Sequence, residues 1–118
     1  MTYAEFQQEF ERLAGLEKER FDRLSVSDLI LEVRAGRLGE CYQIWRSLGE
    51  RASPREINEL LLAYLSSGAD YLHRYHCAAA LIAVNGIGTA WEPAQLSAEA
   101  KYPVSSNLEL VRAQLAGV

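Results

Sequence analysis

The stretch that decides the fold is residues 70–86, Asp-Tyr-Leu-His-Arg-Tyr-His-Cys-Ala-Ala-Ala-Leu-Ile-Ala-Val-Asn-Gly. Its apolar residues are not confined to one side of a helix, which is typical of a helix buried by neighbours on more than one side. Small residues at positions 77, 78 and 80 let other helices approach closely, and Arg74 is the last charged residue. We therefore expect a central helix that begins after Asp70, ends at Gly86 and serves packing rather than chemistry.

A strong helix start precedes this central helix. Ser53 can cap the helix, Pro54 suits its first position, and Glu56 can reach back to the Ser53 amide. The apolar residues that follow form one stripe, which Gly68 ends: Ile57, Leu60, Leu61, Tyr64 and Leu65. We expect this helix and the central helix to form a hairpin.

An earlier hairpin is expected over residues 28–49. Ser27 can cap its first helix, which Gly36 ends through a left-handed residue. The apolar residues of its second helix fall at helical spacing, and Gly49 is placed to stop that helix. These apolar residues are Leu38, Cys41, Tyr42, Trp45 and Leu48.

The N-terminal segment predicts one more helix. Thr2 and Glu5 make a capping box, so a helix is expected from Tyr3 to Ala14, interrupted at Gly15. Its apolar residues recur at helical spacing: Phe6, Phe10 and Leu13. Residues 16–23 are mostly charged and either extend the helix as an arm or form a linker.

The C-terminal part predicts a third, weaker hairpin. A loop containing Trp91 follows Gly86, and a helix is expected from Pro93 to about Ala100. Pro103 breaks that helix, and a last helix carries one apolar stripe: Leu108, Val111 and Leu115.

The spacing of the three hairpins is typical of a helical-pair repeat. Leu29, Leu61 and Leu96 lie in their first helices, 32 and 35 residues apart. In the central helix an arginine is followed by two small residues, then Ala-Leu and an aliphatic residue: Arg74, Cys77, Ala78, Ala80, Leu81 and Val84. This order resembles the second helix of HEAT repeats, with Cys77 as a conservative departure, mainly over residues 56–86. The resemblance implies a stack of helical hairpins that acts as an interaction scaffold.

The alternative architecture is an irregular bundle of six or seven helices, in which the alanines simply mark a central helix. Either way the fold class is all-α, because no window alternates apolar and polar residues between hairpin turns. At 118 residues the chain is expected to form one domain over residues 1–118.

Composition argues against several functions. The formal net charge is −4, from 16 acids and 12 bases, without a basic stripe, so we expect no nucleic-acid partner. The N-terminus lacks a basic region followed by an apolar run, and no apolar stretch is long enough to span a membrane. We therefore expect a cytoplasmic protein, with Cys41 and Cys77 as reduced thiols in the interior.

No constellation of catalytic residues stands out. His73, His76 and Cys77 share part of a helical surface, but no fourth ligand and no CxxC or HxxxH pair accompanies them. Acids alternate with bases in segments such as residues 17–20, which is typical of solvated helix faces. We therefore expect no metal, no cofactor and no enzymatic activity, and an enzyme with an unrecognised pocket is only a minor alternative.

The function predicted from these features is non-enzymatic protein binding. Tyr and Trp are enriched at binding hot spots, and two of them lie beside acids, so the predicted partner contacts are Asp70, Tyr71, Trp91 and Glu92. An alternative is that Trp91 covers the end of the core. An acidic surface suits a basic partner, and the specific hypothesis is an immunity protein that occludes the active site of a bacterial toxin. The alternative function is a structural or adaptor subunit that forms homo-oligomers through its last hairpin.

Overall fold

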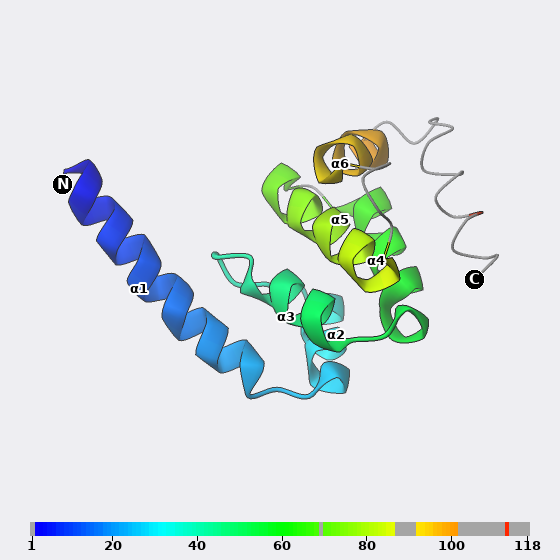
Figure 1. The fold of residues 1–118 in the computed structure, drawn as a ribbon, viewed down its shortest axis with the longest axis horizontal. Helices are drawn as coiled ribbons and strands as arrows, with labels where there is room; N and C mark the ends of the chain where they lie inside the picture. The colour runs from blue at the N-terminus through cyan, green and yellow to red at the C-terminus, as the bar shows by residue number, and fades with distance from the viewer. Residues whose placement is uncertain (1, 69, 87–91, 102–112, 114–118) are drawn as a thin grey trace.

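Helix α5 lies at the centre of the fold, as the sequence predicts. The computed structural model describes residues 2–68, 70–86, 92–101 and 113, and these residues form an all-α fold in which six helices and no strand occur. The helices are α1 (Tyr3–Asp22), α2 (Val26–Ala35), α3 (Gln43–Arg51), α4 (Pro54–Ser67), α5 (Tyr71–Asn85) and α6 (Pro93–Lys101). α3, α4 and α6 all pack against α5, whereas α1 extends away from this body (Figure 1).

The ends of α5 are set by the residues that the sequence indicates. The Asp70 carboxylate accepts hydrogen bonds from the backbone N–H groups of Leu72 and His73, at 2.8 and 3.2 Å. Gly86 ends the helix in the left-handed conformation, with φ of 60°. The start of α4 is also as predicted, because the Ser53 amide donates to Glu56 Oε1 at 2.9 Å.

Small residues set the distance between α3 and α5. A Cβ atom added at Gly49 would lie 3.4 Å from Ala80 Cα and 3.5 Å from Ala80 Cβ, so it would already fill the space between the two helices. The sequence suggests that Gly49 stops α3, and this is wrong, because Gly49 lies inside the helix. Its lack of a side chain allows α5 to approach closely. The predicted hairpin of α4 and α5 is confirmed as two packed helices, while its relation to HEAT repeats stays a prediction.

One hydrophobic core joins all six helices. Its largest fully buried side chains come from each of them: Phe21, Leu29, Ile44, Trp45, Leu48, Ile57, Leu61, Leu65, Leu81 and Leu96. The three leucines at repeat-like spacing are all in this set. Cys41 and Cys77 are buried free thiols, as expected.

The prediction for the start of α3 is wrong. α3 begins at Gln43, and the preceding residues from Leu38 to Tyr42 form a loop. Gly39 and Tyr42 have φ angles of 75° and 62°, which a right-handed helix does not allow. The apolar periodicity continues through this loop, so it could not reveal the break.

Two smaller expectations also differ. The cap of α2 is Ser25 rather than Ser27, since the Ser25 hydroxyl accepts from the Asp28 amide at 3.1 Å. α1 is continuous through Gly15, where nothing lies near enough to force a break, and it includes the charged residues that follow. The predicted last helix, with Leu108, lies outside the described residues.

Candidate protein-binding surface

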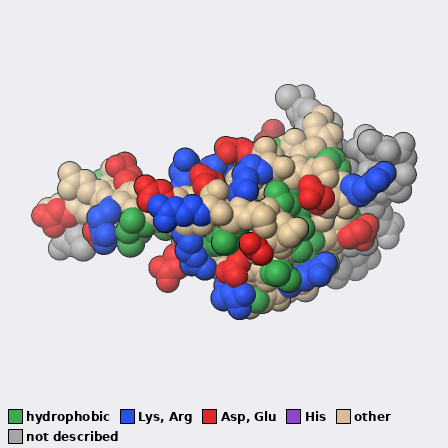
Figure 2. Space-filling view, turned by 90° about the horizontal axis from the view of Figure 1, so that it is seen from below, with side chains coloured by type: hydrophobic (Ala, Val, Ile, Leu, Met, Phe, Trp, Pro, Cys, Tyr) green, Lys and Arg blue, Asp and Glu red, His purple; other side chains and the backbone are tan. Residues whose placement is uncertain are grey.

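The N-terminal part of α1 exposes an unusual number of large apolar side chains. We call residues 3–16 the arm. Five apolar side chains of the arm are between 41% and 80% exposed: Tyr3, Phe6, Phe10, Leu13 and Leu16. The capping box formed by Thr2 and Glu5 begins the helix, so the arm is a regular helix up to its free end. Figure 2 shows it projecting from one side of the molecule with acidic side chains beside the apolar ones.

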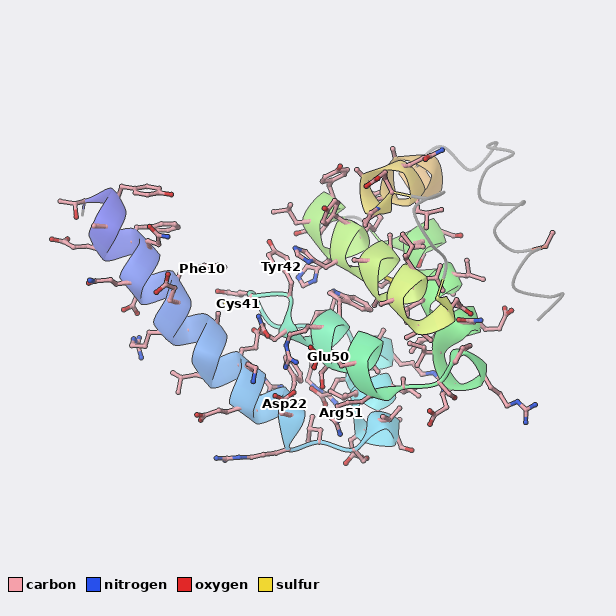
Figure 3. The ribbon with its side chains drawn as sticks, viewed as in Figure 1. Phe10, Asp22, Cys41, Tyr42, Glu50 and Arg51 are labelled. Atoms are coloured by element: carbon pink, nitrogen blue, oxygen red, sulfur yellow. The ribbon has the colours of Figure 1, made fainter. Side chains whose placement is uncertain are left out.

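Polar contacts fix the other end of α1 to α3. The Asp22 carboxylate accepts from Arg46 at 2.7 Å and from the Ser47 hydroxyl at 3.2 Å. Arg51 donates to the Phe21 carbonyl oxygen at 3.3 Å and to the Ser47 hydroxyl at 2.9 Å, close to Asp22 in Figure 3. The bond with Arg46 is the main reason that the pKa of Asp22 lies below its usual value.

Glu17 joins α1 to the loop before α3. Its carboxylate accepts hydrogen bonds from the backbone amides of Glu40, Cys41 and Gln43, at 2.8, 3.0 and 3.2 Å. The N-cap residue of α3 gives no side-chain hydrogen bond, so Glu17 supplies from another helix the acceptor that an N-cap residue usually provides. Gly39 is needed here, because a Cβ atom there would lie 2.1 Å from a Glu17 carboxylate oxygen.

A groove separates the arm from this loop. Its volume is about 320 Å³, and we call it the arm groove. It is lined by Phe6, Glu9, Phe10, Leu13, Glu40 and Cys41. In Figure 3, Phe10 lies on the side of α1 that faces Cys41, with Tyr42 next along the loop. Burial raises the pKa of the Cys41 thiol, and the nearby Glu17 and Glu40 carboxylates raise it further.

Aromatic rings connect the same loop to α5. Tyr42 stacks on His76 with ring centroids 4.5 Å apart and contacts His73 edge-on at 4.8 Å. Trp45 donates from Nε1 to His73 Nδ1 at 3.0 Å, inside the core. Burial lowers the pKa of His76, and the neighbouring His73 adds to this effect. These contacts hold the loop, and therefore one wall of the arm groove, against the body.

A second cavity lies between α3 and α5. Its volume is about 280 Å³, and small residues of both helices line much of it. Arg46 and Glu50 at this cavity form an ion pair at 2.6 Å, so their charges are already compensated. His76 and Trp45, which also line it, are engaged in the ring contacts described above.

Three of the four predicted contact residues lie among the described residues. Asp70 serves as the cap of α5, and Tyr71 beside it is about half exposed. Glu92 is exposed and precedes α6, where its carbonyl oxygen accepts from the amides of Gln95 and Leu96. Trp91 lies outside the described residues. Figure 1 places the N-terminal end of α5 on the side of the body toward α1.

The arm is not among the contacts that the sequence predicts. Phe6, Phe10 and Leu13 identify a helix, but spacing does not say whether a partner face exists within the chain. The prediction that residues 17–20 form a solvated face is wrong for Glu17, because its side chain is partly buried and accepts hydrogen bonds from three backbone amides. The available signal in the sequence is Gly39, a residue type that favours left-handed turns.

The described residues show no metal centre. Among them, no group of three or more His, Cys, Asp or Glu side chains is placed to hold a metal ion. Cys77 is fully buried, and this burial raises the pKa of its thiol well above the usual value. Of the helices described, none combines the length and apolar character needed to cross a membrane.

Comparison with known proteins gives no match for this chain among family models, curated proteins or solved structures.

Proposed function

We propose that this chain is a cytoplasmic, non-enzymatic protein-binding domain that binds its partner through the apolar face of the arm. The observation that carries the proposal is the exposure of five large apolar side chains on one helix. Together they leave about 500 Å² of apolar surface, the size of patch that often marks an interaction site. Leaving this surface in water is unfavourable, and a partner that covers it gains the free energy of burial.

The charge of the arm supports a basic partner. Glu5, Glu9 and Glu11 precede the first basic residue of the arm, Arg12, and the whole chain carries a net charge of −4. Arg12 pairs with Glu9 within the helix, so it does not offset the other two carboxylates directly. An acidic surface speeds association with a basic protein by electrostatic steering.

The most specific form of the proposal is an immunity protein that neutralises a bacterial toxin by covering its active site. A small chain with an acidic, apolar binding face suits a basic toxin domain, since occlusion needs surface complementarity and no chemistry of its own. The predicted contacts at Asp70, Tyr71, Trp91 and Glu92 remain part of this hypothesis. Of these, Tyr71 is the described residue with an exposed aromatic ring.

The alternative is a self-associating structural or adaptor subunit. Tyr3, Phe6, Phe10 and Leu13 follow a 3-4-3 spacing, which suits pairing of two α-helices. This version uses the arm rather than the last hairpin, most of which is not described.

The proposal is tested by affinity capture from the native host with three forms of the full chain. These are the wild type, the double variant Phe6→Asp/Phe10→Asp, and the control Leu31→Asp. Leu31 lies on α2 and is 56% exposed, so the control places one aspartate on an exposed apolar position away from the arm. We expect a partner in near-equal amount with the wild type and the control, and its loss with the double variant. Equal recovery by all three forms would show that the arm is not the binding surface.

A further inference from the structure

We propose that the occupant of the arm groove is a basic amphipathic helix of a partner protein. One apolar side chain of that helix would enter the groove, and its basic side chains would meet the carboxylates beside it. This inference rests on the proposed function, because it names the kind of partner that the arm binds.

The shape of the surface favours a helix. The apolar side chains at 3-4-3 spacing, from Tyr3 to Leu13, form a seam along one helical face, and a second helix can pack its own seam against it. The arm groove lies beside this seam, between Phe10 and Cys41. Its volume of about 320 Å³ can hold an anchoring side chain of the incoming helix. An apolar residue of the incoming helix therefore has a site prepared for it.

The charges around the groove favour a basic helix. Two of its lining residues, Glu9 and Glu40, carry carboxylates, and its lining includes no lysine or arginine. Glu9 pairs with Arg12, so Glu40 contributes the stronger attraction. Arg20, four residues beyond the arm, and Arg37, three residues before Glu40, both pair with Glu32 on α2.

The same charges disfavour a second copy of this chain. If two arms packed in parallel, Glu9 beside the seam of each would lie near the same residue of the other. Like charges at an interface oppose association, whereas lysine or arginine on the partner removes this repulsion.

The groove is formed before any partner binds. Glu17 holds the loop through three backbone amides, and Tyr42 holds it from the other side by stacking on His76. A preformed site loses less conformational entropy on binding. Glu17 is therefore a positioning residue for Cys41 and Glu40 rather than a contact itself.

The test uses two synthetic peptides of about 18 residues, long enough to form a helix when bound. Both carry the same apolar face of leucine and phenylalanine, flanked in one by lysine and arginine and in the other by glutamate. Binding to the full chain is measured by fluorescence anisotropy. The alkylation rate of Cys41 at mildly alkaline pH reports the groove itself, with the fully buried Cys77 as the slow internal reference.

We expect the basic peptide to bind at least about tenfold more tightly than the acidic peptide at low salt, and to slow the alkylation of Cys41. The preference shrinks as salt shortens the range of the attraction. Glu40→Gln should weaken the basic peptide about threefold, because it removes one attracting carboxylate beside the groove. Glu59→Gln, a matched change of an exposed glutamate on α4, should leave binding unchanged.

The remaining outcomes separate this inference from the proposed function. Equal binding of both peptides, or no slowing of Cys41 alkylation by the basic peptide, would refute the inference that a basic helix occupies the arm groove. Neither result would refute partner binding through the arm. A dimer in sedimentation equilibrium that Phe10→Asp disrupts would identify a second copy as the occupant. Equal capture of the partner by the wild type and by Phe6→Asp/Phe10→Asp, with the basic peptide still bound by the wild type, would instead refute the proposed function.

Discussion

Replacing Glu17 tests whether this one carboxylate fixes the loop that forms the groove. Glu17→Ala removes the acceptor of three backbone N–H groups, at 2.8, 3.0 and 3.2 Å. A hydrogen bond to a charged group contributes about 1.5 to 3 kcal/mol, but water can reach part of this loop and the three bonds are not additive. Loss of a helix cap alone costs about 0.5 to 2 kcal/mol.

We therefore expect Glu17→Ala to lower the free energy of unfolding by about 2 to 3 kcal/mol, measured by urea denaturation. Glu17→Gln should have roughly half this effect. The glutamine keeps one acceptor oxygen, but its NH2 group replaces the other oxygen and cannot accept from the backbone N–H groups. Glu19→Ala is the matched control on the same helix, where the side chain is exposed, and it should change stability by less than about 0.5 kcal/mol. If Glu17→Ala and Glu19→Ala gave the same small effect, the role assigned to Glu17 would be wrong.

Three further changes have expected outcomes. Gly49→Val should destabilise the fold by about 1 to 3 kcal/mol in chemical denaturation, because its branched side chain would push α5 away from α3. Trp45→Phe leaves the buried His73 Nδ1 without its donor, so we expect a loss of about 1 to 3 kcal/mol, which a melting curve would show. Arg46 lowers the pKa of Asp22 in the folded state. The ionised Asp22 carboxylate therefore stabilises the fold at pH values above its unfolded pKa, and this stabilisation is lost as the pH falls through the folded-state pKa. In urea denaturation from pH 7 to pH 3, Asp22→Asn should therefore be less stable than the wild type at neutral pH, and the difference should narrow with acid; a constant difference would contradict this.

The central helix and its partner α4 could be predicted because their signals are local. Asp70 and Gly86 bound α5 through hydrogen bonding and backbone conformation that depend on neighbouring residues only. The small residues between them indicate contact with several helices, and α3, α4 and α6 do pack there. Such features need no knowledge of the rest of the chain.

The beginning of α3 could not be predicted in this way. The cap of this helix comes from Glu17, 26 positions before Gln43, so no local pattern near residue 43 identifies it. The apolar residues of the loop keep a helical spacing although Gly39 and Tyr42 have left-handed backbone conformations. A contact between distant segments decided the local structure.

The proposed binding surface on the arm could not be predicted for a related reason. The spacing of Phe6, Phe10 and Leu13 is the same whether a helix packs on its own core or presents that face to a partner. Only the three-dimensional arrangement shows that these side chains are between 41% and 59% exposed. The alternating charges of the segment after them are typical of a solvated face. That segment nevertheless includes Glu17, whose hydrogen bonds to three backbone amides hold the loop that forms one wall of the arm groove.

The measurement that tests the central claim most directly is hydrogen–deuterium exchange of the full chain, free and bound to the partner that it captures. The backbone amides of the arm should exchange rapidly in the free chain, since this part of α1 has few tertiary contacts. If the arm and its groove are the binding surface, the partner should slow exchange mainly in residues 3–16 and 37–42. Protection confined to the start of α5 and to α6, with the arm unchanged, would contradict the claim and favour the surface around Tyr71 and Glu92.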